Sequence, residues 1–329
     1  MCADFNYLKR LSLSGEDLDN GIIGFSSDSN YFYFSIDNKI KVFSISNEDS
    51  YSKSLGEKII SITSANVGSL FISTSKKTFE WNYLNDNLNI FFEFPNDAQP
   101  FCSTFKPNSE TLVSARKDTL SLWSLRQKSE ISRYQITFEN SAESIRKIIF
   151  NPDGKTFFTS TNVNPLSGTI GRSLSEKLRI NKPHALIKWS SQTGKPTHLL
   201  GDTVDMWSDL LSISQDGTTL IRSDYDGIKF YDIANDTPSV RTVIDDPEEL
   251  DTLYSLQALP NGKSVLLGDL EGRIAIVTEK GEIKLIKYCF GDKEEAVEEI
   301  ALNKQGTLIS ARSNTVSGDY SVAKIWRII

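Results

Sequence analysis

The chain contains few of the residues from which metal and disulfide sites are built. It has two histidines, His184 and His198, and three cysteines, Cys2, Cys102 and Cys289. Two histidines are too few for a multi-histidine metal site, and three widely spaced cysteines match neither a disulfide framework nor a Cys-x-x-Cys metal site. We therefore expect no cofactor, no metal and a reducing compartment, the cytoplasm or alternatively the nucleus.

Long apolar runs, the pattern of a secretory signal and an excess of positive charge are not seen in the sequence either. No stretch approaches the roughly 18 to 20 consecutive apolar residues of a membrane-spanning helix. The N-terminal segment MCADFNYLKR lacks the basic flank and apolar core of a secretory signal. With 36 Lys and Arg against 43 Asp and Glu, the formal net charge is -7, which disfavours unspecific contact with nucleic acid phosphates. We expect neither a membrane nor a nucleic acid among its partners.

What the chain does contain is a pattern of short strands. The stretch from Leu211 to Asp232, LSISQDGTTLIRSDYDGIKFYD, has three alternating apolar runs separated by turns at Asp216-Gly217 and Asp226-Gly227. Alternation with a period of two is typical of strands, and Asp-Gly between two such runs is typical of a hairpin turn. The stretch predicts three consecutive antiparallel strands.

The same pattern recurs seven times. The residues in the glycine position of the first turn are Ser29, Gly68, Ser109, Gly154, Gly217, Gly262 and Gly306, and the large residues that end the third run are Phe43, Trp81, Trp123, Trp189, Tyr231, Val277 and Trp326. A period of about 40 to 45 residues with four strands per repeat is typical of a β-propeller blade. Seven blades use nearly all 329 residues, so we expect one all-β domain over residues 1–329.

The repeat resembles the WD40 repeat, whose third strand ideally reads Asp-Gly-Thr-Ile-Lys-Leu-Trp-Asp. The nearest matches are DNKIKVF from Asp37, DGIKFYD from Asp226, EGRIAIV from Glu271 and WSSQTGK from Trp189. The resemblance covers nearly the whole chain, although no Trp-Asp or Gly-His pair occurs, so no blade can hold the complete Ser/His/Asp/Trp network of the family. It implies a seven-bladed, WD40-like propeller that recognises proteins or peptides on its top face, where the connectors between blades lie.

The two ends of the chain are expected to meet. Leu8 to Leu13 alternates before the first full blade, whereas the seventh blade ends at Trp326-Arg327-Ile328-Ile329 without a fourth strand. We predict that residues of about 5–13 supply the outer strand of the last blade, because an open edge would leave unpaired backbone groups. An unpaired N-terminal tail is the alternative.

Two insertions interrupt the repeats on the expected top face. Blade four carries about 21 extra residues, roughly 162–184, and blade seven has a smaller insertion around Arg312 to Asp319. The first insertion is basic at Arg172, Lys177 and Arg179. It is either a partner-contact element or an ordinary solvated loop.

The connectors that follow this insertion supply further candidates. Trp207 is either an interface anchor or an inward-packing residue that begins blade five. Two acidic connectors contain Asp245, Glu248 and Glu249, then Glu294 and Glu295. They either attract a partner with a basic surface or serve only solubility.

No motif points to catalysis. The sequence has no phosphate-binding loop, no dinucleotide fingerprint, no His-Glu-x-x-His and no Gly-x-Ser-x-Gly elbow. We therefore predict a non-catalytic scaffold, a subunit of a hetero-complex, that binds partners through top-face loops of blades four to seven. Two alternatives stay open: a propeller hydrolase or lactonase with calcium held by carboxylates in the central channel, and a purely architectural subunit that uses its blade edges.

Overall fold

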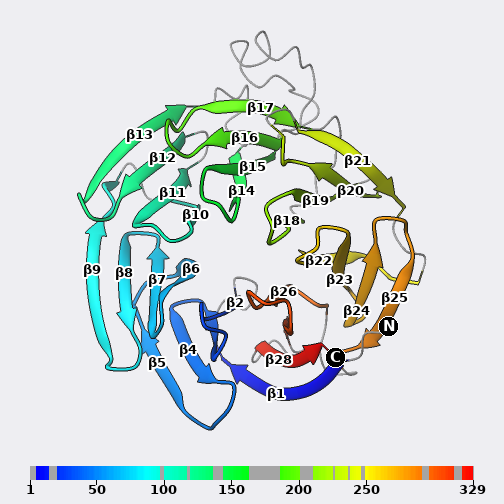
Figure 1. Ribbon diagram of the computed structural model, residues 1–329. Helices are drawn as coiled ribbons and strands as arrows, with labels where there is room; N and C mark the ends of the chain where they lie inside the picture. The colour runs from blue at the N-terminus through cyan, green and yellow to red at the C-terminus, as the bar shows by residue number, and fades with distance from the viewer. Residues whose placement is uncertain are drawn as a thin grey trace.

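The chain forms a closed ring of small antiparallel sheets (Figure 1). The computed structural model describes residues 5–14, 21–96, 100–116, 119–135, 144–162, 186–200, 210–224, 227–235, 238–245, 249–290, 296–314 and 321–328. These ranges contain 28 strands in seven four-stranded sheets and no α-helix. This is the arrangement of a seven-bladed β-propeller, so the predicted fold class is confirmed.

Each blade is a meander whose first strand lies nearest the axis. Blade one contains β2 (Ile22–Phe25), β3 (Tyr31–Ile36), β4 (Lys39–Ser44) and β5 (Ser50–Ser54); blade two β6 (Ile59–Asn66), β7 (Ser69–Thr74), β8 (Lys77–Asn82) and β9 (Asn87–Glu93). Blade three contains β10 (Cys102–Phe105), β11 (Thr111–Arg116), β12 (Thr119–Ser124) and β13 (Ser129–Gln135); blade four β14 (Ser144–Phe150), β15 (Thr156–Asn162), β16 (Leu186–Ser190) and β17 (Pro196–Leu200). Blade five contains β18 (Leu211–Ile213), β19 (Thr219–Asp224), β20 (Gly227–Asp232) and β21 (Ser239–Ile244); blade six β22 (Leu253–Ala258), β23 (Ser264–Asp269), β24 (Arg273–Thr278) and β25 (Ile283–Tyr288).

Blade seven joins the two ends of the chain. It contains β26 (Glu299–Leu302), β27 (Leu308–Asn314), β28 (Ser321–Ile328) and, as its outer strand, β1 (Phe5–Leu13). β1 pairs antiparallel with β28 from Phe5↔Ile328 to Leu13↔Ser321. The predicted closure is therefore confirmed, and the ring has no blade with a missing strand.

Apolar side chains on the second and third strands build the core between blades. The predicted large residues pair across these strands as Phe32/Phe43, Leu70/Trp81, Leu112/Trp123, Phe157/Trp189, Leu220/Tyr231, Val265/Val277 and Ile309/Trp326. Trp189 is fully buried and stacks on Phe157 with ring centroids 5.9 Å apart. Val113 of blade three belongs to the same apolar cluster, so this core joins two neighbouring blades.

The first turn of each blade needs a residue with positive φ, which explains the recurring glycine. Gly154, Gly217 and Gly262 have φ of 69°, 72° and 62°. Ser29 adopts the same region with φ 61°. In blade three the positive φ of 52° falls on Asn108, one residue before the predicted Ser109, because asparagine tolerates this conformation better than serine.

The insertions differ in how far the structure describes them. The blade-four insertion lies outside the described residues, apart from Asn162 at the end of β15. In blade seven, Arg312 to Asn314 continue β27 and pair with β28, so this part of the predicted loop is strand. None of the residues that the structure describes forms a helix with the length and apolarity to cross a bilayer.

Candidate binding site at the upper mouth of the channel

The ring has two different mouths. The innermost strand of every blade starts after the connector from the preceding blade and ends in the first hairpin turn. We call the end with the connectors the upper mouth, which is the top face of the sequence prediction, and the end with the first turns the lower mouth. The upper mouth also receives the turns between second and third strands, where the two insertions lie.

β-bulges shape the upper mouth. The register of the innermost strand shifts at Ile60 in blade two, Arg146 in blade four and Tyr254 in blade six. In all three blades, the residue after the bulge is aligned across the sheet with the same position of the third strand, counted back from the large residue of that strand. The three bulges are therefore equivalent. A bulge leaves one residue unpaired and redirects its side chain, so three blades present a side chain at the entrance of the channel.

Other blades place a residue at the same position without a bulge. Phe101 donates its backbone N–H to Ala115 O at 2.8 Å, and Glu298 donates to Arg312 O at 2.9 Å. In blade one this position is held by Gly21, the residue before the first pair of β2 and β3. In blade five it is residue 209, which lies outside the described residues. We call this set the mouth ring: Gly21, Ile60, Phe101, Arg146, Tyr254 and Glu298. Its aromatic members are accessible, with Phe101 62% and Tyr254 41% exposed.

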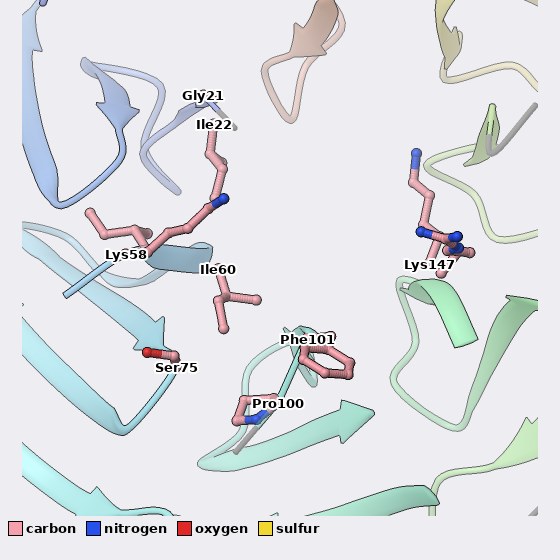
Figure 2. A pocket seen from close by; sticks show the side chains of 10 residues that line it. Gly21, Ile22, Lys58, Ile60, Ser75, Pro100, Phe101 and Lys147 are labelled. Carbon is pink, nitrogen blue, oxygen red and sulfur yellow. The ribbon is translucent and has the colours of Figure 1, made fainter. Parts of the chain in front are cut away.

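A cavity of about 630 Å³ occupies the part of the upper mouth formed by blades one to four (Figure 2). Four members of the mouth ring line it, together with Ile22, Lys58, Ile59, Ser75, Pro100 and Lys147. The described lining thus combines apolar side chains with three cations and includes no carboxylate. In Figure 2, Ile60 and Phe101 lie between Lys58 on one side and Lys147 on the other.

The wall between blades seven and one is built around a buried arginine. A Cβ on Gly21 would lie 2.7 Å from both Cδ and Nε of Arg312, so only glycine leaves room for this side chain. Glu299 Oε2 lies 3.7 Å from Arg312 Nε and accepts a hydrogen bond from the Ile23 backbone N–H at 3.1 Å. These contacts join two blades whose sequences are far apart.

The same wall perturbs two titratable groups. Burial raises the pKa of Glu299 to about 7, opposed by Arg312, the Ile23 N–H and Lys147. Burial also raises the pKa of Tyr33, with a further contribution from Glu299. Glu299 therefore changes its protonation near neutral pH, although its side chain keeps 31% exposure.

On the far side of the ring, an ion pair between a buried aspartate and a partly buried arginine secures the connector between blades five and six. Asp269 is fully buried and lies 2.6 Å from Arg273 Nε. Its Oδ2 also accepts a hydrogen bond from the backbone N–H of Asp251 at 3.2 Å. This pair holds the end of the acidic connector against blade six.

The structure describes only two of the nine predicted partner-binding residues. Asp245 and Glu249 are exposed and lie in the connector between β21 and β22, at the upper mouth. The other seven lie outside the described residues: Arg172, Lys177, Arg179, Trp207, Glu248, Glu294 and Glu295. The site on blades four to seven stays a prediction, and the described cavity lies over blades one to four.

Sequence reasoning missed Ile60, Phe101 and Arg146. Each falls just before or within an innermost strand, where simple alternation does not reveal a bulge. The only signal was the position of Lys58, Arg146 and Lys147 at the starts of two such strands. His198 lies on the outer strand β17, and His184 lies outside the described residues.

The lower mouth is formed differently. A cavity of about 210 Å³ lies among the first turns of blades five to seven, lined in part by Gln215, Gln257, Asn303 and Lys304. Asn303 Oδ1 accepts hydrogen bonds from the backbone N–H groups of Thr307 and Leu308 at 2.8 and 2.9 Å. Gln215 Nε2 donates to Lys304 O. The polar side chains of this mouth largely hold its own turns.

A search for metal sites and comparisons with known proteins do not assign a function to this site. Among the described residues, no group of three or more His, Cys, Asp or Glu side chains is arranged to hold a metal ion. No protein-family model matches the chain, and no curated protein matches it.

Proposed function

We propose that this protein is a non-catalytic scaffold that binds a protein or peptide at its upper mouth as one subunit of a hetero-complex. The observation that carries the proposal is the mouth ring. Seven four-stranded sheets form the ring, and Phe101 and Arg146 lie at its upper rim, where they line a cavity of about 630 Å³. Exposed aromatic and arginine side chains at a concave site are typical of binding hot spots.

We also infer that the chain is a degenerate member of the WD40 type of propeller. Two blades support this inference with part of the family's network. Trp123 Nε1 donates to Ser114 Oγ at 2.8 Å, and Trp189 Nε1 donates to Thr159 Oγ1 at 2.8 Å. Ser114 and Thr159 occupy equivalent positions on the second strands of their blades. Each lies two residues after the residue that pairs with the tryptophan across the sheet.

The scaffold explains the described residues better than the hydrolase alternative does. Glu299, a carboxylate in the channel wall, contacts Arg312 and a backbone N–H. No observation favours a calcium-dependent hydrolase. We propose the cytoplasm as its compartment, because Cys289 is a buried free thiol whose pKa burial raises to about 12.

Affinity purification with cross-linking mass spectrometry tests this function. Wild-type protein should retain a partner whose cross-links fall on upper-mouth connectors. A double F101A/R146E variant or an E294K/E295K variant should lose it, while both melt at the wild-type temperature. A partner retained by both variants and cross-linked to the outer strands would instead indicate the architectural subunit.

The controls lie at the other end of the ring. Lys304 is exposed at the lower mouth, and Val67 is 61% exposed in the first turn of blade two. K304E and V67A repeat the charge change and the loss of apolar surface away from the proposed site. Both should retain the partner.

A further inference from the structure

We propose that the cavity of blades one to four binds an acidic segment of another protein, one that carries an aromatic or aliphatic side chain next to its carboxylates. This inference rests on the proposed function and gives its ligand chemistry. It does not follow from the fold, because the mouth-ring residues that line the cavity differ from blade to blade. It follows from the cations and apolar groups that this chain places together.

The apolar part of the cavity is a short wall between blades two and three. Ile60 reaches the cavity because it is the bulged residue of β6, and Phe101 occupies the equivalent position before β10. Pro100 completes this wall. Since Phe101 is 62% exposed, a side chain that covers its ring removes apolar surface from water. One aromatic or aliphatic anchor is the ligand group that this wall accommodates.

The cations flank that wall from two blades. Lys58 comes from the start of blade two and Lys147 from blade four (Figure 2). Arg146, the neighbour of Lys147 on β14, also lines the cavity. Arg146 is the bulged residue of β14 and is exposed. A guanidinium binds carboxylates in two-point geometry, and lysine adds a less directional charge. Carboxylates on both sides of the apolar anchor would therefore meet a cation.

One acidic side chain, Glu299, lies behind the cavity near Lys147. Glu299 interacts electrostatically with Lys147, but burial raises its pKa to about 7 and its Oε2 accepts the Ile23 N–H. At neutral pH only part of the population carries this negative charge. Neither Glu299 nor Glu298 of the mouth ring belongs to the described cavity lining, which contains no carboxylate.

The opposite side of the upper mouth adds selectivity. Asp245 and Glu249 are exposed in the connector between blades five and six. An acidic segment is repelled from this side and attracted to blades one to four, so the two halves of the mouth orient it. A basic segment would have the reverse preference.

A nucleic acid fits these residues less well than a peptide. Binding to a phosphate backbone uses a track of cations along a groove, and single strands use a series of aromatic platforms. Here three cations surround one cavity with a single aromatic side chain, and the whole chain has a formal net charge of -7. The observations therefore favour a short peptide segment.

Peptide selection against the full-length protein tests the ligand class directly. A random peptide library displayed on phage should yield sequences with at least two Asp or Glu within three positions of an aromatic or aliphatic residue. Fluorescein-labelled copies of the enriched peptides then serve as probes for fluorescence anisotropy. R146E should lower their affinity about tenfold and F101A by a similar factor, and high salt should weaken binding.

Matched variants keep these results interpretable. K304E and V67A should bind the probes within about twofold of wild type, because they lie at the lower end of the ring. All variants should unfold at the wild-type temperature. Replacing the acidic residues of a probe by Asn and Gln, or its apolar anchor by Ala, should each reduce affinity about tenfold.

Several outcomes would overturn the inference. These are a library that yields basic sequences or none, equal losses for R146E and K304E, tighter binding of a single-stranded RNA oligonucleotide, or anisotropy changes caused by self-association of the chain. If cross-linking still finds a partner that F101A/R146E loses, the scaffold function stands and only the ligand chemistry is wrong. If no partner depends on either half of the upper mouth, the scaffold function itself fails.

Discussion

The two mouths of the channel are made by the same seven strands, yet they differ in what their side chains do. At the lower mouth, Asn303 and Gln215 hold the backbone of nearby turns. At the upper mouth, bulges and connectors leave Phe101 and Arg146 exposed beside a larger cavity. The comparison teaches that the polar side chains of the lower end stabilise its turns, whereas the upper end leaves side chains exposed, as the proposed binding function requires.

Opening the ring should abolish both mouths at once. Deleting residues 1–13 removes β1, leaves β28 as an unpaired edge and takes away the buried Leu11 and Leu13. We expect a loss of more than about 4 kcal/mol in unfolding free energy and aggregation of the purified chain. Urea unfolding and light scattering measure both effects.

A shorter deletion, of residues 1–4, is the control for this truncation because it leaves β1 intact. It should unfold like wild type. Cooperative wild-type-like unfolding of the 1–13 deletion would contradict the role assigned to the closing strand.

Substitution of two glycines that have similar φ, one at each mouth, should cost different amounts of unfolding free energy. Gly217 at the lower mouth has φ 72°, and a Cβ at this residue would collide with Oδ1 of Asn151. The Nδ2 atom of the same asparagine donates a hydrogen bond to Gly217 O. Gly56 in an upper connector has φ 73° and open space around it. G217A should cost about 2 to 3 kcal/mol, from strain plus the collision, and G56A about 1 kcal/mol.

Denaturant unfolding of the two variants checks this difference. Both report on the same backbone strain, so subtracting one from the other isolates the packing of the turn against the neighbouring blade. Equal costs for G217A and G56A would show that the lower turns are no more tightly packed than the upper connectors.

The raised pKa of Glu299 gives the upper mouth its own pH dependence. The ordinary value is 4.5 and the folded value is about 7, so between these limits the folded chain binds more protons at this carboxyl than the unfolded chain. Its contribution to stability is complete below pH 4.5 and is lost as pH rises through 7. E299Q, which stays neutral, should gain about 1 to 2 kcal/mol relative to wild type between pH 5 and pH 8.

Urea unfolding of wild type and E299Q at both pH values measures this change. The groups acting on Glu299 are Arg312, Lys147 and the Ile23 N–H, and Tyr33 responds to its charge. A wild-type stability that rises with pH relative to E299Q would reverse the sign and contradict the assignment.

The smallest stability effects are expected at the mouth ring itself. F101A and R146E remove exposed side chains, so each should change the unfolding free energy by less than about 0.5 kcal/mol. Thermal unfolding checks this expectation. A clear destabilisation would mean that these residues support the fold. Their effects on binding would then have to be compared with those of control variants that are destabilised to the same degree.

Much of the fold could be predicted because its signals are local. The strand alternation, the turn glycines and the seven large residues of the third strands all recur within one repeat, and the unfinished last blade predicted closure by β1. The candidate site was largely missed. A bulge such as Arg146 depends on how two strands pair, and the same alternation is compatible with a regular strand.

The sequence by itself determined the blade: which residues alternate, where the chain turns and how many copies follow one another. Only the tertiary structure decided what meets at the mouth. The Ile23 N–H and Glu299 Oε2 are 276 residues apart in sequence and 3.1 Å apart in space, and Gly21 is required by Arg312 of another blade. Alternation arises from the backbone period of neighbouring residues, whereas contacts across a closed ring depend on every blade between them.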